Sequence, residues 1–417
     1  MNILFLTDNF PPEVNAPSSR TFEHAREWVR SGHSVTVVTC APNFPEGRLF
    51  AGYKNALYAT EVMEGIKVVR VWSYISANQG FLKRSLDYAS FMVSATLASP
   101  WTGRADIVVA TSPQFFTVVA GYIVSRLRRR PFVFELRDLW PESIKVVGAM
   151  NDGRALRTLE RLELFLYRRA ARIISVTNAF KADLISRGID GGKIDVVTNG
   201  ADLSRFSPMA KDAELLKSLH LERTFIAGYV GTHGMAHALD TLLDAAALLK
   251  ARGNHTARIL LLGSGAQKAT LKERAATDGL DNVVFIDTVP KHEVARYWSL
   301  LDASIIHLKK TPLFTTVIPS KLFECMAMGI PVIHGVAGES AEIVRRTGCG
   351  LEVEPQNAVA IADAIETLQN DPAQRALLAA AGTAGAREYE RSKLAERMLS
   401  LLRQTAEDGG KLRERSR

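Results

Sequence analysis

The sequence alternates short apolar segments with segments of helical period, and it runs through this alternation twice. In the first half, the segments expected to form strands are residues 3–7, 34–39, 68–72, 107–111, 132–136, 173–176 and 194–197. Helix-period segments separate most of them. Alternation of this kind predicts a parallel sheet that is covered by helices on both faces.

The same alternation begins again after a polar stretch around Pro208. The expected strands are 225–230, 258–262, 283–286, 303–307 and 331–333, and the expected helices are 238–251, 266–278, 291–300, 321–328 and 338–346. The fold class is therefore α/β, with two doubly wound, Rossmann-like parallel sheets in tandem and a break between residues 201 and 221. Ligands of such sheets bind at the carboxyl ends of the strands, so the cleft between two facing domains is the expected site.

Residues 318–343 are the most informative single stretch for function. Pro319, Ser320 and Lys321 open an apolar helix that carries one carboxylate, Glu324, and Gly329 ends that helix. A helix N-terminus with a lysine suits phosphate, and a carboxylate one turn inside suits ribose hydroxyls. A nucleotide-diphosphate donor fits both, although Glu324 also fits a role in stabilising its own helix, and Lys321 also fits a solvated surface position.

Composition and cysteine usage indicate a cytoplasmic protein of two packed domains. The chain has 417 residues, of which 47% are hydrophobic and 23% charged, as in ordinary soluble proteins. Cys40, Cys325 and Cys349 show no paired spacing, which fits a reducing compartment. The amino-terminal residues read as a buried strand rather than a targeting segment, and residues 111–114 interrupt the longest uncharged stretch, so we expect no membrane span.

The net charge of +8 is concentrated in arginines of the first half. These are Arg126, Arg128, Arg129, Arg130, Arg154, Arg157, Arg161, Arg168, Arg169 and Arg172. They fit solvated helix faces, and they equally fit contact with an anionic membrane surface or an acidic substrate. Residues 79–101 form an amphipathic segment that suits either a membrane surface or a helix facing the core. Nucleic acid is not expected as a partner, because no interleaved aromatics or binding motif is present.

Several motifs in order resemble the retaining glycosyltransferases of family 4. They are residues 199–202 with Phe206, residues 231–234, residues 262–265, Asp302 with Ala303, and Pro319–Lys321 with Glu324. The resemblance covers almost the whole chain. Within the family it is strongest to the branch with an Asp-Leu-Trp-Pro-Glu-Ser segment, here residues 138–143, whose members build bacterial surface polysaccharides and include a fucosamine-type transferase.

The resemblance implies a GT-B architecture and a division of labour between its domains. Residues 1–205 would bind the acceptor, residues 206–385 would bind the nucleotide sugar, and residues 386–417 would form a last helix that returns to the first domain, followed by a basic tail. It further implies transfer with retention of configuration. The expected donor is a UDP-linked, N-acetylated amino sugar, and the expected acceptor is a lipid-linked saccharide for O-antigen, capsule or exopolysaccharide.

The same resemblance places the donor-binding residues in the second half. They are Gly231, Thr232, His233, Gly234, His237, Gly263, Gly265, Val289, Thr316, Pro319, Ser320, Lys321, Leu322 and Glu324. The chain departs from the family at three of them. Thr232 and His237 replace an arginine and a lysine, so Lys321, His237 and helix N-termini are expected to carry the diphosphate charge. Thr316 replaces the first of two paired glutamates, and it suits either a contact with the donor sugar or a plain turn.

In the first half, two stretches at strand ends supply candidates for the acceptor side and for catalysis. Glu13, Asn15 and Arg20 follow the first strand, with Ser18 or Ser19 as the expected N-cap of the next helix. Arg137 and Asp138 end the strand at 132–136. An arginine there can stabilise the departing diphosphate and an aspartate can take the acceptor's proton, and an ion pair that orders the loop is the alternative.

We expect no metal and no other cofactor. No Asp-x-Asp pair occurs in the chain, and the nine histidines are not clustered at metal-ligand spacing. Fixed electrostatics from helix N-termini, backbone amides and Lys321 would then meet the leaving-group charge. Two other functions stay open at this point: a nucleotide-sugar 2-epimerase of the same two-domain outline, and a non-catalytic nucleotide-sugar binding protein.

Overall fold

A computed structural model describes the chain except residues 45, 77–80, 140–152, 291 and 415–417. The chain divides into two compact units. One consists of Met1–Thr198 together with Arg391–Arg417, and the other of Asn199–Glu390. The sequence analysis placed the corresponding boundaries after residues 205 and 385. Each unit is described by itself below.

The first unit is built on an eight-stranded sheet, whose strands are β1 (Asn2–Leu6), β2 (Ser34–Cys40), β3 (Tyr58–Met63), β4 (Ile66–Val71), β5 (Ile107–Thr111), β6 (Phe132–Leu136), β7 (Arg172–Ser175) and β8 (Ile194–Val196). Their order in the sheet is β3-β4-β2-β1-β5-β6-β7-β8. All neighbours are parallel except β3, which pairs antiparallel with β4. The prediction of a wholly parallel sheet is therefore wrong at this edge, where Glu64 and Gly65, both with positive φ, make a two-residue hairpin turn that the sequence analysis did not recognise.

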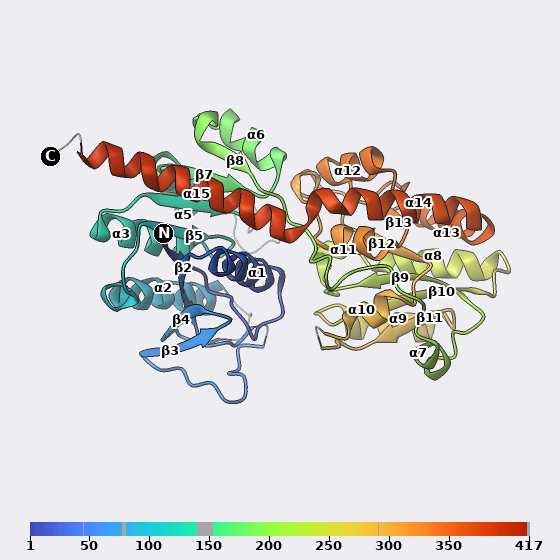
Figure 1. The fold of residues 1–417 in the computed structure, drawn as a ribbon. Coiled ribbons are helices and arrows are strands. Elements are labelled where there is room, and N and C mark those ends of the chain that lie inside the picture. Colours follow the sequence, from blue (N-terminus) through green and yellow to red (C-terminus); the bar gives the residue numbers. More distant parts are fainter. Residues whose placement is uncertain (45, 77–80, 140–152, 291, 415–417) are drawn as a thin grey trace. The chain divides into compact units, whose positions relative to one another are not determined.

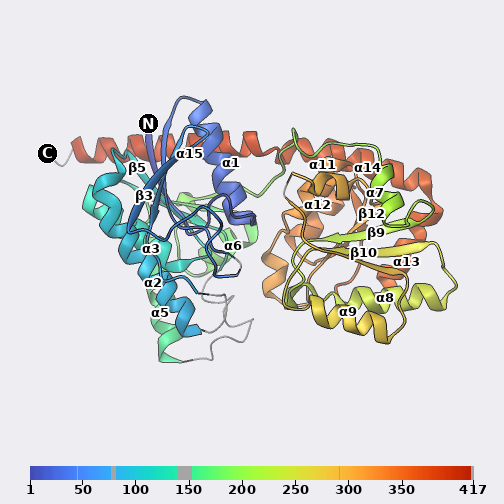
Figure 2. The same cartoon turned by 90° about the horizontal axis from the view of Figure 1, so that it is seen from below.

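Helices cover both faces of this sheet (Figures 1 and 2). They are α1 (Ala16–Arg30), α2 (Phe81–Ala98), α3 (Phe115–Arg128), α5 (Arg154–Arg169), α6 (Asn178–Ser186) and α15 (Arg391–Glu414), with short 3-10 turns η1 (Ser99–Thr102) and η2 (Gly191–Lys193). Alternate residues of β1 face opposite cores: Leu4 packs in the core under α2 and α3, and Phe5 packs in the core under α1 and α15. The indole of Trp28 on α1 donates a hydrogen bond to the carbonyl of Ala395 on α15, at 2.8 Å.

The second unit contains a six-stranded, wholly parallel sheet. Its strands are β9 (Phe225–Val230), β10 (Ala257–Leu262), β11 (Val283–Ile286), β12 (Ala303–His307), β13 (Val332–Gly335) and β14 (Gly350–Glu352), in the order β11-β10-β9-β12-β13-β14. Its helices are α7 (Ala213–Ser218), α8 (Asp240–Ala251), α9 (Lys268–Thr277), α10 (Val294–Trp298), α11 (Lys321–Met328), α12 (Glu339–Thr347), α13 (Ala358–Asn370) and α14 (Pro372–Ala386), with η3 (Met235–His237), η4 (Leu313–Thr316) and η5 (Arg387–Tyr389). In both sheets the strand order reverses beside the first strand, which is where open α/β sheets bind ligands.

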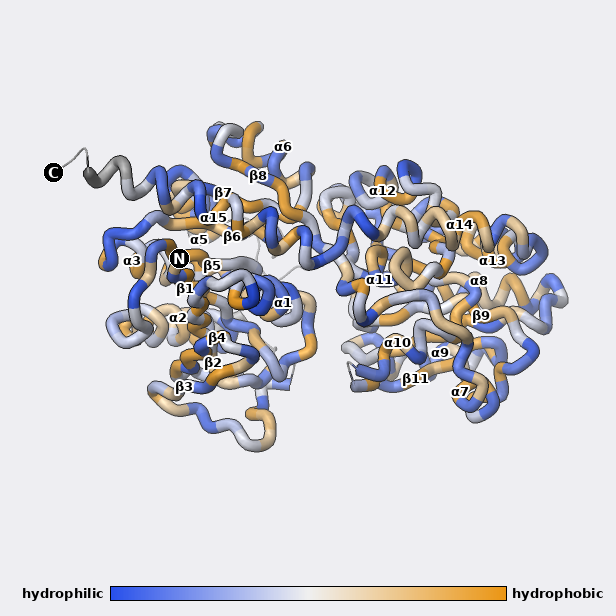
Figure 3. The backbone as a smooth tube through the Cα atoms, in the orientation of Figure 1, coloured by the Kyte–Doolittle hydropathy of each residue, from blue (hydrophilic) through white to orange (hydrophobic). Residues whose placement is uncertain are grey.

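The prediction of two doubly wound α/β domains is confirmed, and every predicted strand is present with ends shifted by no more than two residues. Hydrophobic residues lie along the strands inside each unit, and hydrophilic ones are frequent on outer helices such as α1 (Figure 3). Gly329 ends α11 in a left-handed conformation, with φ at 67°, as expected. The predicted N-cap of α1 is wrong, because Asn15, and not Ser18 or Ser19, accepts the capping hydrogen bond.

Two further features bear on the sequence predictions. Cys40, Cys325 and Cys349 are buried free thiols. Within the described part of the chain, none of the helices combines the length and the apolar character that spanning a membrane requires.

Candidate functional site

In the second unit, three glycines sit where the turns after β9 and β10 meet. Gly231, Gly263 and Gly265 have φ values of 144°, 139° and 153°, which L-residues rarely adopt. A Cβ on Gly263 would lie 1.9 Å from the carbonyl oxygen of Gly231, and one on Gly265 would lie 2.5 Å from that of His233. The turns are tied together by the amide of His233, which donates to the carbonyl of Ser264 at 2.8 Å. The glycine positions of the predicted site are therefore required by close backbone packing at the switch point of the sheet.

Lys321 begins α11 and reaches the same turns. Its ammonium lies 3.6 Å from the ring centroid of Tyr229, a cation–π contact, and a Cβ on Gly231 would lie 2.9 Å from its Nζ. Burial lowers the pKa of Lys321 to about 7, and the negative charge of Glu324 opposes that shift only in part. Lys321 is half-buried next to the glycine turns. With a pKa near 7, its charge depends on the charge of any ligand that binds beside it.

Three histidines around these turns are held neutral. Burial lowers the pKa of His233 to about 4 and that of His237 to about 3, and Lys321 adds to both shifts. Neither ring nitrogen of His233 has a hydrogen-bond partner among the described residues, although the side chain is fully buried. His307 accepts from the amide of Gln356 at 2.9 Å, so its other nitrogen, 2.8 Å from the carbonyl of His237, carries the proton. His237 is therefore neutral without a ligand, and its assignment as a cation for the diphosphate stays a prediction.

The remaining predicted donor residues lie near the start of α11 or in neighbouring turns. Ser320 is the N-cap residue of α11 without a side-chain capping bond, and Glu324 lies in the first turn of that helix. Thr316 ends η4, where its hydroxyl donates to the carbonyl of Leu313 at 2.6 Å, which is the bonding of a turn residue. Leu322 is fully buried, and Val289 packs against the same hydrophobic core. The other predicted donor residues are Thr232, which is exposed, Gly234, which is the N-cap of η3, and Pro319, which precedes Ser320.

The sequence analysis missed two side chains that belong to this arrangement. The hydroxyl of Tyr229 donates to the carbonyl of Thr232 at 2.8 Å, and its ring makes the cation–π contact with the ammonium of Lys321. Lys268 donates to the carbonyls of Gly263 and Ile286, at 2.5 and 2.9 Å, and so holds the ends of β10 and β11. Tyr229 gave no signal because it reads as an ordinary strand residue. Lys268, five residues after Gly263, was identifiable as the lysine that follows the second glycine turn.

In the first unit, Arg20 is buried and its guanidinium is occupied. It donates to Glu135 at 2.9 Å and to the carbonyls of Val197 and Thr198, at 2.9 and 2.6 Å. Its side chain is 3% exposed and that of Glu135 is 2% exposed. Arg20 therefore stabilises the end of the first unit, and contact between Arg20 and an acceptor stays a prediction.

Asn15 and Glu13 shape the loop after β1. The side-chain oxygen of Asn15 caps α1 by accepting from the amide of Ser18 at 2.9 Å, and its amide group donates to Asn9 at 2.5 Å. Glu13 is 4% exposed. Its Oε1 accepts from the amides of Asn43 and Phe44, at 2.8 and 2.9 Å. Both residues thus fix the loop conformation at the carboxyl end of β1.

Arg137 and Asp138 follow β6, and Ser112 orients them. The hydroxyl oxygen of Ser112 accepts from both of their amides, at 2.8 and 3.3 Å. Burial lowers the pKa of Arg137 to about 10, and its guanidinium donates to the carbonyl of Pro17 at 3.3 Å. Part of the 138–143 segment, residues 140–143, lies outside the described residues, as do residues 79 and 80 of the amphipathic segment.

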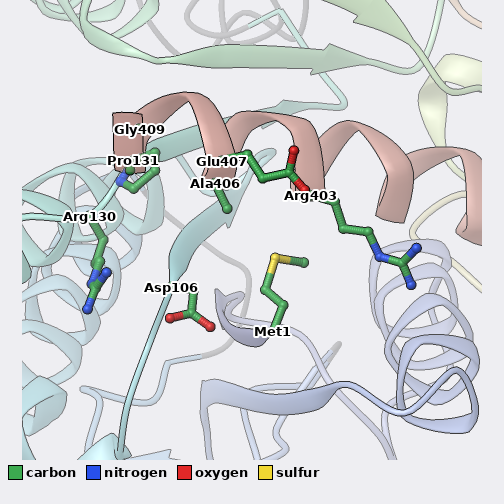
Figure 4. Close-up of a pocket in the computed structure, with 9 residues that line it drawn as sticks. Met1, Asp106, Arg130, Pro131, Arg403, Ala406, Glu407 and Gly409 are labelled. Atoms are coloured by element: carbon green, nitrogen blue, oxygen red, sulfur yellow. The ribbon is translucent and has the colours of Figure 1, made fainter. Parts of the chain in front are cut away.

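A separate cavity of about 280 Å³ lies in the first unit (Figure 4). Met1, Asp106 and Pro131, which line it, come directly before β1, β5 and β6, so the cavity lies at the amino ends of the strands. Asp106 accepts from the amide and the side chain of Asn2, at 2.7 and 3.0 Å. This is the edge opposite the predicted site, so the cavity is not part of it.

Chemically, the glycine turns of the second unit suit an anion. They combine close backbone approach, a lysine and neutral histidines, and the carboxylate of Glu324 stands one turn into α11. Among the described residues, no group of three or more His, Cys, Asp or Glu side chains is arranged to hold a metal ion. A diphosphate would meet backbone amides and Lys321, and ribose hydroxyls would suit Glu324.

Comparison with protein families places a glycosyltransferase domain in each half. Residues 15–200 match the glycosyl transferase 4-like domain, and residues 224–371 match glycosyl transferases group 1. One similar protein is WcaI of Escherichia coli (strain K12), named as a colanic acid biosynthesis glycosyl transferase, which is 26% identical over 98% of this chain and 99% of its own length. Another is a GDP-mannose-dependent alpha-mannosyltransferase of Mycobacterium tuberculosis, 25% identical over 85% of this chain and 84% of its length.

Solved structures with the same fold include one in complex with UDP and one of a glycosyltransferase. HepE of Anabaena in complex with UDP has a TM-score of 0.72 at 19% identity and covers 97% of this chain and 100% of its own. WaaG, a glycosyltransferase involved in lipopolysaccharide biosynthesis, has a TM-score of 0.71 at 15% identity, over 96% and 99% of the two chains. These likenesses extend over both domains and confirm the predicted GT-B fold class.

Proposed function

We propose that this chain, which belongs to the glycosyltransferases through a glycosyl transferase 4-like domain and a following group 1 domain, moves a sugar from a UDP-linked donor to a lipid-linked saccharide. The sugar is an N-acetylated amino sugar, and the product serves a bacterial surface polysaccharide. Transfer retains the anomeric configuration and needs no metal. Residues 199–390 bind the donor, and the first unit binds the acceptor.

The observation that carries this proposal is the meeting of Lys321 with the glycine turns after β9 and β10. The Nζ of Lys321 is so close to Gly231 that a Cβ there would lie 2.9 Å from it. Gly263 and Gly265 leave no room for side chains between the two turns. A cation beside main chain without side chains, at the switch point of a parallel sheet, suits a diphosphate, which is common to all nucleotide-sugar donors.

The relatives support the class of donor and product. WcaI is named for colanic acid biosynthesis, the mycobacterial relative for dependence on GDP-mannose, and the HepE structures hold UDP or UDP-glucose. We favour UDP over GDP because the whole-length structural likeness to HepE comes with UDP in its site. The choice of an amino sugar follows from the family branch that residues 138–143 resemble.

In the proposed reaction, the bond between the anomeric carbon and the donor phosphate breaks, and a bond to an acceptor oxygen forms on the same face of the sugar. Lys321 and the backbone amides of the glycine turns take the charge of the departing diphosphate. Asp138 takes the proton that the acceptor hydroxyl loses, and Arg137 adds positive charge for the leaving group. Ser112, which fixes the main chain of both residues, is a positioning residue in this scheme.

We further propose that the first unit rests on an anionic membrane surface through α2 and η1. Leu86, Val93, Leu97 and Trp101 are 58%, 51%, 66% and 66% exposed, although Phe91 on the same helix is buried. The spacing of Leu86, Val93 and Leu97 places them along one side of α2, and Trp101 follows in η1. The exposed cations Lys83, Arg104, Arg126, Arg129 and Arg130 in and near these elements suit anionic headgroups. Sedimentation with vesicles of anionic and of zwitterionic lipid tests this part, and Trp101→Ser should weaken binding to the anionic ones.

Thermal unfolding tests the donor site. Purified protein is unfolded with EDTA present against UDP, GDP, ADP and dTDP, and the series is repeated on Glu324→Ala. A ligand that binds only the native state stabilises it by about 2.7 kcal/mol at a hundred times its Kd. UDP should raise the midpoint most, without added metal, and Glu324→Ala should lose most of that gain.

The matched control for this experiment is Glu342→Ala. Glu342 is also a first-turn glutamate, on α12, and it is exposed. It should keep the full response to UDP. If no diphosphate shifts the wild type, or if both variants respond alike, the donor-site assignment fails. Incubation of UDP-sugars without acceptor then separates the alternatives, since a 2-epimerase consumes donor alone and a binding protein turns over nothing.

A further inference from the structure

The strand β3 is an open edge of the sheet in the first unit. It lies last in the strand order, and its main chain pairs with β4 alone among the described residues (Figure 1). The register runs without a break from Tyr58 opposite Val71 to Met63 opposite Ile66, so no bulge disturbs this edge. In an antiparallel ladder every second residue turns its N–H and C=O away from the neighbouring strand. β3 therefore presents main-chain groups along its outer side that no described strand takes up.

The other edges of the two sheets are shorter than β3. In the described chain the edge strands β8, β11 and β14 have three, four and three residues, whereas β3 has six. A very short edge strand is one of the devices by which proteins prevent a second chain from adding to a sheet. β3 lacks this protection, and its sequence contains neither proline nor lysine, the residues that otherwise blunt such edges.

Apolar side chains are exposed along this edge. Leu57, which precedes β3, is 82% exposed, Val62 is 73% exposed and Tyr58 is 41% exposed. An edge that combines unprotected main chain with exposed apolar side chains is a surface to which another strand can add. The one charged side chain within β3, that of Glu61, already accepts from the guanidinium of Arg70 on β4 at 2.5 Å. The edge therefore carries little unpaired charge that would repel a partner.

The geometry of an antiparallel ladder restricts how a second copy of β3 can pair with this edge. Residues that face each other in such a pair both turn their main-chain groups toward the partner strand, or both turn them away. When a strand pairs with its own copy, the facing residues are therefore both even-numbered or both odd-numbered. Two registers then pair five of the six residues of β3. One runs over residues 58–62 with Thr60 facing itself, and the other runs over residues 59–63 with Glu61 facing itself.

Only the first of these registers keeps like charges from facing each other. In the second, the two Glu61 carboxylates would lie directly opposite, which is destabilising. In the first, Tyr58 faces Val62 of the second copy, and Glu61 faces Ala59. An aromatic residue opposite a β-branched one and threonine opposite threonine are both favourable cross-strand pairs. Each Glu61 also brings its own Arg70, so the glutamates that approach the contact are neutralised within each copy.

We propose that β3 is the surface through which two copies of this chain associate, with the two β3 strands antiparallel and Thr60 facing Thr60. The two eight-stranded sheets then join into one continuous sheet. A single strand on each side buries less than a standard interface, so the dimer should dissociate on dilution.

The proposed pairing also fixes on which side of the joined sheet the helices lie. Facing residues of an antiparallel pair point to the same side of a sheet, so the twofold axis is perpendicular to the sheet. Both copies of α2, which packs against β2 and β4, therefore lie on the same side. Joint contact of the two copies with one membrane surface requires this arrangement, and this consequence alone rests on the membrane contact proposed above.

The test is sedimentation velocity of the full-length protein in a dilution series. The wild type should show an equilibrium between monomer and dimer. Thr60→Lys and Thr60→Glu should each weaken the dimer about fivefold or more, because like charges would face each other at the twofold axis. An equimolar mixture of the two variants should dimerise again, because opposite charges then face each other. A role of Thr60 in folding alone would not produce this recovery.

The matched control is Thr158→Lys. Thr158 is an exposed threonine on α5 of the same unit, and this variant should dimerise as the wild type does. Thr60 is also exposed, so its variants should fold. Thermal unfolding of dilute samples checks this, since equal midpoints of the variants and the wild type show that loss of the dimer is not loss of the fold.

Three outcomes would overturn the proposed pairing. The first is a wild type that stays monomeric at every concentration. The second is a dimer that Thr60→Lys weakens no more than Thr158→Lys does, which would indicate another surface, such as the exposed side of α2. The third is an equimolar mixture of Thr60→Lys and Thr60→Glu that does not dimerise, which would show that Thr60 does not face itself. None of these outcomes depends on the proposed donor site.

Discussion

The carboxyl ends of β1 and β9 occupy equivalent places in two sheets of similar order, yet their surroundings are opposite in chemistry. After β9 stand Gly231 and, on the neighbouring turn, Gly263, with Lys321 beside them. After β1 stand Asp8 and Glu13. The first set brings together main chain without side chains and a cation, and the second set brings carboxyl groups, of which that of Glu13 is 4% exposed.

This difference shows that one architecture can carry side chains of opposite charge at equivalent places. The fold supplies the switch point in both sheets, but it does not decide what binds there. In the second unit, glycines let two turns pack closely beside Lys321, where we propose that a diphosphate binds. In the first unit, a longer loop brings carboxyl groups to the equivalent place. The predictions below test each half of this contrast, beginning with the largest expected effect.

Gly263→Ala should be the most damaging single substitution. Its Cβ would lie 1.9 Å from the carbonyl oxygen of Gly231, at a φ of 139°. Either the turn after β9 or the turn after β10 must move, which we expect to cost about 3 kcal/mol of unfolding free energy or more. The response of the unfolding midpoint to UDP should disappear, as chemical denaturation and thermal unfolding would show.

Gly253→Ala is the control for that substitution. Gly253 also has a positive φ, of 76°, but nothing lies within 4 Å of the added Cβ. Gly253→Ala adds backbone strain but no steric clash. It should therefore cost about 1 kcal/mol of unfolding free energy and keep the full response to UDP. Equal effects of the two substitutions would mean that close packing of the two turns is not what the donor site requires.

The affinity for UDP should depend on pH through Lys321. The pKa of this lysine is lowered to about 7 in the unliganded protein, and a bound diphosphate raises it again. Above pH 7 binding must therefore take up a proton, so the affinity should fall, by up to about tenfold per pH unit. Isothermal titration between pH 6.5 and pH 8.5, in two buffers of different ionisation heat, measures both the affinity and the proton uptake.

Lys321→Arg sharpens this prediction. The guanidinium stays charged throughout the range, so proton uptake on binding should vanish. Lys321→Met should lose affinity by about tenfold or more at pH 6.5, because a charged hydrogen-bond donor to the phosphate is gone. The same proton uptake in Lys321→Arg and in the wild type would show that another group titrates, and Lys321 would no longer be the phosphate ligand.

Sequence patterns predicted the fold well because each domain repeats one unit. Buried parallel strands such as residues 225–230 and 303–307 are apolar throughout, which gives a strong local signal. The missed strand, β3, alternates half-buried and exposed residues at the sheet edge and is joined by a two-residue turn without the usual Asn-Gly or Asp-Gly pair. The capping residue Asn15 was missed because Ser18 and Ser19 are equally good capping residues in isolation.

The candidate site could be predicted only where function constrains residue type locally. Glycines at strand ends and Lys321 at a helix start were visible in the sequence. The neutral state of His237 was not, because it depends on burial and on the nearby charge of Lys321, which lies 84 positions further along the chain.

On the carboxylate side of the contrast, Glu13→Gln should stabilise the protein above pH 7. The pKa of Glu13 is raised to about 7 in the folded state from an ordinary value of 4.5, so the folded state binds more protons between these values. Stability is therefore lost as pH rises from about 4.5 to about 7. The variant should gain about 1–3 kcal/mol over the wild type at pH 8 and little at pH 4.5, as urea denaturation at the two pH values would show.

A gain of the same size at both pH values would contradict this reading of Glu13. Glu46→Gln, at an exposed position, provides the baseline and should change stability by less than about 0.5 kcal/mol at either pH.

The smallest effect is expected at Thr316, where the family resemblance implies a glutamate. Its hydroxyl donates to the carbonyl of Leu313 at 2.6 Å, and that of Thr315 donates to Pro312 at 2.7 Å in the same turn. Thr316→Val and Thr315→Val should therefore each cost about 0.5–1 kcal/mol and leave the UDP response unchanged. The decisive comparison is UDP against UDP-N-acetylglucosamine. If Thr316→Val, but not Thr315→Val, weakens binding of UDP-N-acetylglucosamine, the hydroxyl of Thr316 contacts the donor sugar. The donor site of the second unit would then extend from the diphosphate to the sugar.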